Sequence, residues 1–67
     1  MNRDQLIRAL KAYCRKRELH FLEDRKKGKG SHYRVEVGDK WTTVQSDLNP
    51  GKIRTILKQL GVDPADL

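Results

Sequence analysis

The two histidines of the chain, His20 and His32, are its strongest candidates for acid–base chemistry, because an imidazole titrates close to neutral pH. His32 follows a basic, glycine-containing loop, and Lys29 and Arg34 flank it in the sequence. An imidazole among cations and backbone amides suits phosphodiester cleavage, in which the 2′-hydroxyl of RNA loses a proton and the phosphorus centre gains negative charge. We therefore predict that His32 is a general acid/base in RNA cleavage that needs no metal. The alternative is a surface histidine without a function.

The basic residues are concentrated in the first half of the chain, as the binding of a polyphosphate would require. Residues 1–34 hold 11 Lys and Arg against 4 Asp and Glu, whereas residues 35–67 hold 4 against 5. The loop 26–30, with two glycines around a lysine, suits a hairpin tip or, more loosely, a phosphate-cradling loop. The alternative is a solvated basic surface that keeps the protein in solution. The predicted RNA and phosphate contacts are Lys26, Lys27, Lys29, Gly30, Ser31 and Arg34.

Two aromatic residues and the cysteine have competing interpretations. His20 is either a second acid/base or a strand histidine packed beside an apolar neighbour, and Trp41 either stacks on a nucleobase or covers the end of the core. Cys14 lies on an apolar helical stripe and is predicted to be a buried small hydrophobe rather than a nucleophile. One cysteine excludes an internal disulfide, and the spacing of the histidines and carboxylates gives no metal site. We expect neither a metal nor another cofactor.

Hydrophobic periodicity predicts a helix near each end of the chain. Apolar residues at helical spacing indicate the first helix over 3–17, with Asp4 as its N-cap. The second helix should start at Asn49-Pro50, an N-cap followed by proline at the first helical position, and stop at Gly61. Asp63-Pro64 then suits the start of one more short turn. Both helices are amphipathic, so each needs a partner for its apolar stripe.

Three stretches between the helices have the composition of antiparallel strands. In the clearest of them Tyr33, Val35 and Val37 alternate with polar residues, so His32 and Arg34 are expected on the opposite, solvated face. The predicted strands are 19–25, 31–37 and 40–45, the last two joined by a turn at 38–39.

The order of these elements predicts an α+β fold, α-β-β-β-α, in which a three-stranded antiparallel sheet carries both helices on one face. At 67 residues we expect a single domain, 1–67, with one thin core and no deep enclosed cavity. No apolar run approaches the roughly 20 residues of a membrane span, and the start of the chain lacks the apolar region of a secretory signal. We expect a cytoplasmic protein with no membrane partner.

Two segments of the chain resemble the HicA toxin family. The first is Gly30-Ser31-His32 after a basic glycine loop. The second is the run 49–61, in which a Pro-Gly pair leads into a helix of the pattern Ile-Arg-Thr-Ile-Leu-Lys-Gln-Leu-Gly. The opening segment 4–11 is similar to the first helix of the family, so the resemblance spans nearly the whole chain.

The resemblance implies a small fold like that of double-stranded-RNA-binding domains, in agreement with the predicted element order. HicA-like proteins are mRNA interferases, the toxins of type II toxin–antitoxin systems, and the histidine of their triplet is catalytic. By resemblance, His32 is therefore the catalytic residue of an endoribonuclease. The implied partners are mRNA and a HicB-like antitoxin that neutralises the toxin by covering its active face.

Two other functions account for the same basic residues. A non-catalytic RNA-binding module of this fold would read RNA by its shape and its phosphates, with no special role for His32. A small adaptor would dock an acidic protein against its basic face. RNA cleavage, salt-sensitive binding without cleavage, and capture of an acidic protein distinguish the three.

Overall fold

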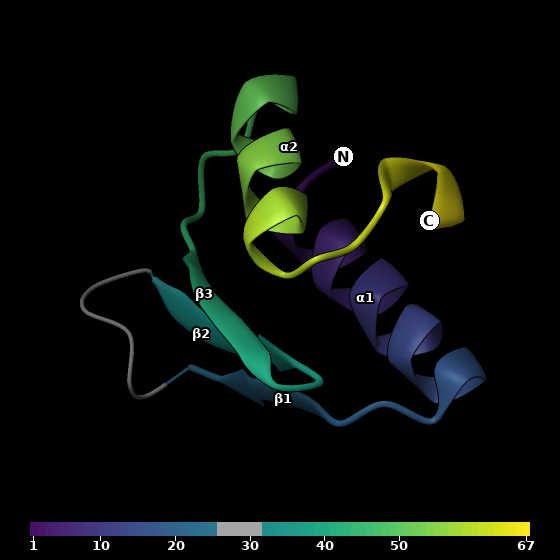
Figure 1. The fold of residues 1–67 in the computed structure, drawn as a ribbon. Helices are drawn as coiled ribbons and strands as arrows, with labels where there is room; N and C mark the ends of the chain where they lie inside the picture. The colour runs from purple at the N-terminus through teal and green to yellow at the C-terminus, as the bar shows by residue number, and fades with distance from the viewer. Residues whose placement is uncertain (26–31) are drawn as a thin grey trace.

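The computed structural model describes residues 1–25 and 32–67 and has the expected α-β-β-β-α order (Figure 1). The helices α1 (Arg3–Arg17) and α2 (Pro50–Gln59) cover the same face of a three-stranded sheet, which confirms the predicted layout. A 3₁₀ turn, Pro64–Asp66, follows α2, where a short turn was predicted. In the part of the chain that the structure describes, neither helix has the length and apolar character needed to cross a bilayer.

The sheet consists of β1 (Phe21–Asp24), β2 (Tyr33–Val37) and β3 (Lys40–Val44), with β2 in the middle and both pairings antiparallel. Each strand begins and ends within two residues of its predicted limits. Gly38 makes the turn between β2 and β3 at a φ of 62°, in the left-handed region that glycine adopts without strain. Within the described residues β3 pairs with β2 alone, so one side of β3 is a free sheet edge.

Helix α1 has the predicted limits, but its N-cap is not the predicted residue. The side chain of Asn2 accepts a hydrogen bond from the Gln5 N–H at 2.8 Å, and the Gln5 side chain accepts one from the Asn2 N–H at 2.9 Å. This reciprocal capping box makes Asn2 the N-cap, so the prediction of Asp4 was wrong. Asp4 instead lies in the first turn, where its charge is favourable near the positive end of the helix dipole.

Helix α2 begins as predicted, because Asn49 accepts a hydrogen bond from the backbone N–H of Lys52 at 2.8 Å and Pro50 occupies the first helical position. The helix ends before Gly61, whose φ of 69° reverses the chain. The chain direction at both ends of α2 is thus set by local residues rather than by distant contacts.

The core lies between the two helices and one face of the sheet. The predicted apolar stripes are buried, and Cys14, at 1% exposure, is the buried hydrophobe that was predicted; burial also raises the pKa of its thiol. Phe21 packs against this core from β1, and Thr42 is buried beside it from β3. The buried hydrophobic residues are Leu6, Ile7, Leu10, Cys14, Val35, Val37, Val44, Ile56, Leu57, Leu60 and Val62.

In the part of the chain that the structure describes, no helix covers the opposite face of the sheet, and we call it the open face. Strand register places Leu22 opposite Glu36 and Glu36 opposite Trp41, so all three point away from the core. Trp41 is 54% exposed and Leu22 37%. The open face therefore combines exposed apolar side chains with charged ones.

Candidate functional site

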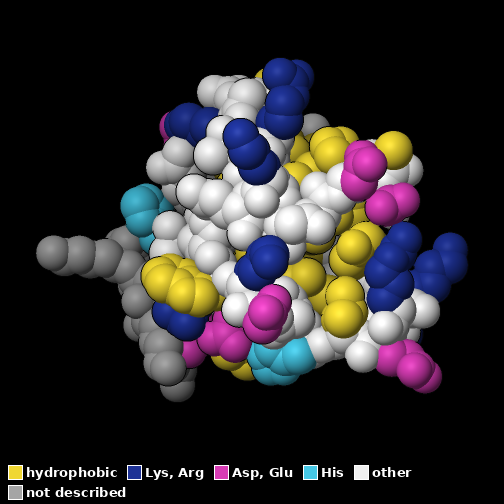
Figure 2. Space-filling view, viewed as in Figure 1, with side chains coloured by type: hydrophobic (Ala, Val, Ile, Leu, Met, Phe, Trp, Pro, Cys, Tyr) yellow, Lys and Arg dark blue, Asp and Glu magenta, His cyan; other side chains and the backbone are white. Residues whose placement is uncertain are grey.

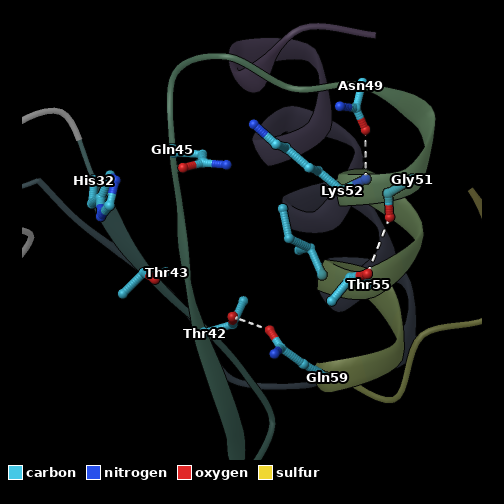
Figure 3. A pocket seen from close by; sticks show the side chains of 10 residues that line it. His32, Thr42, Thr43, Gln45, Asn49, Gly51, Lys52, Thr55 and Gln59 are labelled. Carbon is cyan, nitrogen blue, oxygen red and sulfur yellow. Dashed lines mark hydrogen bonds between the residues drawn. The ribbon is translucent and has the colours of Figure 1, made fainter.

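His32 stands one residue before β2 and is half-buried. Its side chain lines an open pocket with a volume of about 510 Å³, which lies beside the free edge of β3 and against α2 (Figure 3). We call this space the β3–α2 pocket. His32 is thus placed at the rim of a solvent-accessible hollow rather than beneath the helices.

The β3–α2 pocket is lined mainly by neutral polar side chains, and no carboxylate is among its lining residues. Besides His32, they include one cation, Lys52, and one buried apolar side chain, Ile56. In Figure 2 white surface lies over β3 and α2, with dark blue Lys and Arg side chains among it. The amide and hydroxyl side chains of the lining are those of Thr42, Thr43, Gln45, Asn49, Thr55 and Gln59.

Hydrogen bonds fix several of these side chains in place. The Thr42 hydroxyl donates to Oε1 of Gln59, which ties β3 to the last turn of α2. The Asn49 side chain accepts a hydrogen bond from the backbone N–H of Lys52. The Thr55 hydroxyl donates one at 3.1 Å to the backbone carbonyl of Gly51. The wall that α2 contributes is therefore held both at its start and near its end.

Lys52 brings the positive charge of the β3–α2 pocket. Its Nζ lies 3.2 Å from a carboxylate oxygen of Asp47 and 3.3 Å from the carbonyl oxygen of the same residue. The hydrogen bond from Lys52, followed by a backbone hydrogen bond and the positive charge of Lys52, lowers the pKa of the Asp47 carboxyl. Asp47 is 81% exposed, so solvent screens this ion pair and it contributes little to stability.

Lys52 and Gln45 were not among the predicted site residues. In Figure 3 the Gln45 side chain, which follows β3, and the Lys52 side chain from α2 point toward one another. The available signal was the polar side of α2, where Lys52, Thr55 and Gln59 recur at helical spacing beside the apolar stripe. That spacing indicates a site only when α2 is known to pack along β3, because the polar side of the helix then faces the strand edge.

Arg34 was predicted to bind phosphate beside His32, and it lies on the open face. Its Nε is 3.0 Å from a carboxylate oxygen of Glu36, and its guanidinium stacks over the ring of Trp41 at 4.0 Å. Arg34 is not a lining residue of the β3–α2 pocket, so the structure does not bring it together with His32 there. The other predicted contacts lie outside the described residues: Lys26, Lys27, Lys29, Gly30 and Ser31.

His20 and Trp41 both belong to the open face rather than to the pocket. His20 is 55% exposed, and its Nε2 lies 2.9 Å from the second carboxylate oxygen of Glu36. Bonds from His20 and then Arg34 lower the pKa of the Glu36 carboxyl. Trp41 does not cover the end of the core, because its side chain is exposed beneath the Arg34 guanidinium. His20 is therefore not placed to act together with His32 in the β3–α2 pocket.

A second charged region follows the outer side of α1. A shallow depression there is lined by four basic side chains and Ala12. We call it the α1 basic face; its basic residues are Arg8, Lys11, Arg15 and Lys16. These four side chains are part of the charge excess that the sequence places in its first half.

In comparisons with known proteins, no family model, no curated protein and no solved structure matches the chain. The HicA resemblance is therefore a prediction that rests on the segments 4–11, 30–32 and 49–61 and on the element order. Within 1–25 and 32–67, no three His, Cys, Asp or Glu side chains come together as metal ligands would.

Proposed function

We propose that the chain is an endoribonuclease that cleaves mRNA without a metal, with His32 as the general acid/base. One observation supports the proposal most: His32 borders an open, polar pocket that also holds a lysine. An acid/base must reach its substrate, and phosphoryl chemistry needs a nearby positive charge. His32 and Lys52 meet these two requirements with side chains from different elements.

The proposed reaction uses the nucleophile that RNA carries. His32 accepts the proton of the 2′-hydroxyl as the 2′-oxygen attacks phosphorus and the bond to the 5′-oxygen breaks. The resulting imidazolium, or water, returns a proton to the departing 5′-oxygen, which leaves a 2′,3′-cyclic phosphate and a 5′-hydroxyl end. Lys52 stabilises the negative charge that builds up on the phosphoryl oxygens.

The sequence adds the finer parts of this proposal. Lys26, Lys27, Lys29, Gly30, Ser31 and Arg34 are proposed RNA and phosphate contacts. The resemblance to HicA supports the further proposal that the chain is the toxin of a type II toxin–antitoxin system. Its partner would then be a HicB-like antitoxin that covers the face bearing His32, and both would act in the cytoplasm.

Incubation with RNA, with DNA of the same sequence, and with EDTA tests the reaction. We expect cleavage of RNA alone, cyclic phosphate ends, and no effect of EDTA. His32→Ala should abolish cleavage and keep the fold, because His32 lies outside the buried core. His20→Ala is the matched control and should cleave normally, since His20 is bonded on the open face. Cleavage of DNA, inhibition by EDTA, or an active His32→Ala protein would contradict the proposal.

A second candidate, a non-catalytic RNA-binding module, is favoured by the α1 basic face. Four basic side chains on one exposed side of a helix can bind phosphates without any chemistry. This module would bind RNA in a salt-sensitive manner, leave it intact and tolerate His32→Ala. For single-stranded RNA, Lys11→Gln and Arg15→Gln should each reduce the slope of log affinity against log salt by about 0.7, because each removes one cation that neutralises a phosphate.

A further inference from the structure

We propose that the β3–α2 pocket binds a nucleobase next to the scissile phosphate and discriminates among the four bases. The inference deepens the proposed function and rests on it for the identity of the ligand as RNA. It assigns the interior of the pocket to the base, and its His32 rim to the ribose and phosphate.

The lining of the pocket suits a base better than a phosphate. Its polar side chains are mostly uncharged amides and hydroxyls, which donate and accept hydrogen bonds as base edges do. Ile56 adds an apolar wall, and an open pocket of about 510 Å³ is within the size range of small-molecule sites. A phosphate site would instead need several cations or several unbonded N–H groups.

The start of α2 does not supply those N–H groups. The side chain of Asn49 already accepts the bond of the Lys52 N–H, and its backbone carbonyl accepts that of Ile53. Pro50 has no N–H to offer. The Lys52 and Ile53 amides are therefore occupied, and the Lys52 ammonium, which also pairs with Asp47, is the charged group that α2 offers a phosphate.

Gln45 is the residue best suited to read the base. Among residues 1–25 and 32–67 its side chain makes no hydrogen bond, although it lines the pocket and is half-buried. A carboxamide presents one donor and one acceptor in a plane, which allows a bidentate contact with a base edge. The edge position of β3 adds outward-facing backbone N–H and C=O groups on the same side.

Gln59 and Thr42 complete the far end of the pocket. Because Oε1 of Gln59 accepts the Thr42 hydroxyl, the Gln59 amide nitrogen is left as a donor with a fixed direction. A donor held by a neighbour costs less conformational entropy on binding than a mobile one. His32 borders the same pocket, so a nucleotide whose base lies between Gln45 and Gln59 can carry its phosphate toward the imidazole.

Titration of the isotope-labelled full chain with mononucleotides tests this inference by NMR. The probes are the 3′-monophosphates of adenosine, guanosine, cytidine and uridine, with ribose 5-phosphate as the control without a base. We expect shifts at Thr43, Gln45 and Thr55, and affinities that differ about tenfold between the best and worst base, as a bidentate base contact gives. Ribose 5-phosphate should bind more weakly than every nucleotide.

Variants of Gln45 locate the discrimination. Gln45→Ala should bring the four affinities to within about twofold of one another. Gln45→Glu keeps the size but removes the donor, so it should change the order of the bases. Lys58→Ala, on the exposed side of α2, is the control and should keep the wild-type order. Equal binding of all five probes to the wild-type protein, or discrimination that survives Gln45→Ala, would overturn the inference.

The binding experiment can fail or succeed independently of the proposed nuclease function, because mononucleotides are bound but not cleaved. Base-selective binding by a protein that never cuts RNA would support the base pocket and reject the nuclease. Cleavage of RNA with no base preference at the cut sites, before or after Gln45→Ala, would support the nuclease and reject the base pocket.

Discussion

Replacement of Asn49 by alanine should destabilise the protein and weaken nucleotide binding together, whereas replacement of Asn2 should only destabilise it. Both residues are N-caps whose Oδ1 accepts a backbone N–H at 2.8 Å, so each alanine variant loses one equivalent hydrogen bond. Only the Asn49 bond holds a turn that lines the β3–α2 pocket. The pair thus compares the same chemical change at two places in the fold.

The magnitude follows from the exposure of the two caps. Loss of an N-cap side chain costs about 0.5–2 kcal/mol. Both bonds are exposed, so water can satisfy the abandoned N–H and the cost should fall in the lower half, about 0.5–1 kcal/mol. For a domain of this size, about 1 kcal/mol shifts Tm by about 4–8 °C, so each variant should melt about 2–8 °C lower.

The functional effect comes from Lys52, whose backbone Asn49 anchors. Without this bond the first turn of α2 can fray, and Lys52 and Thr55 lose their fixed positions in the pocket wall. We expect severalfold weaker nucleotide binding for Asn49→Ala, measured well below its Tm by NMR titration. Asn49→Asp should recover the stability, because aspartate caps a helix as well as asparagine.

Thermal unfolding followed by circular dichroism provides the stabilities of the same samples. If Asn49→Ala melts lower but binds nucleotides as the wild type does, the first turn of α2 does not shape the pocket. If Asn2→Ala weakens binding equally, the effect is one of global stability, and the assignment of the pocket wall to α2 is wrong.

Three further changes test the fold and its electrostatics. Leu10→Ala, at a fully buried position, should cost about 2–5 kcal/mol in chemical denaturation, and a loss below about 1 kcal/mol would contradict the described core. Gly61→Ala and Gly38→Ala should each cost about 1–2 kcal/mol at their left-handed φ, and the losses should be similar, because the new Cβ at Gly61 would meet only the flexible end of the exposed Lys40 side chain. The pKa of Glu36 is lowered in the folded protein, so its stabilising effect is complete above the unfolded carboxyl pKa and lost as pH falls through the folded value. The difference in Tm between the wild type and Glu36→Gln should therefore be larger at pH 7 than at pH 3. An equal difference at both pH values would refute a stabilising role for the contacts of Glu36 with His20 and Arg34.

The fold was predictable because its signals are local. The Asn49-Pro50 start of α2 and the alternation of Tyr33, Val35 and Val37 depend on neighbouring residues, and both agree with the structure. The Asp4 cap failed for a local reason as well. Asp4 and Asn2 are both good capping residues, and the reciprocal bond to Gln5 decides between them.

The site was only partly predictable because it depends on contacts between distant residues. His32 was found from its residue type and its neighbours in sequence. The wall opposite it requires α2 to lie along the edge of β3, as the Thr42–Gln59 hydrogen bond shows, and no sequence period encodes that contact. Likewise, alternation placed Arg34 on the open face, but the pairing of β2 with β3 determines that Trp41 lies beside it.

The distribution of charge suggests a division of labour between two surfaces. The chain carries a net charge of +6, yet among the described residues the β3–α2 pocket is lined by one lysine, His32 and uncharged side chains. Attraction of a polyanion is a long-range effect that exposed cations such as Arg8, Lys11 and Arg15 can supply from a separate helix face. Discrimination between bases is a short-range effect that a pocket crowded with lysines would weaken, because phosphate would compete for it. If the chain acts on RNA, affinity should therefore follow salt concentration, whereas base preference should not, since the contacts that determine each are on different elements.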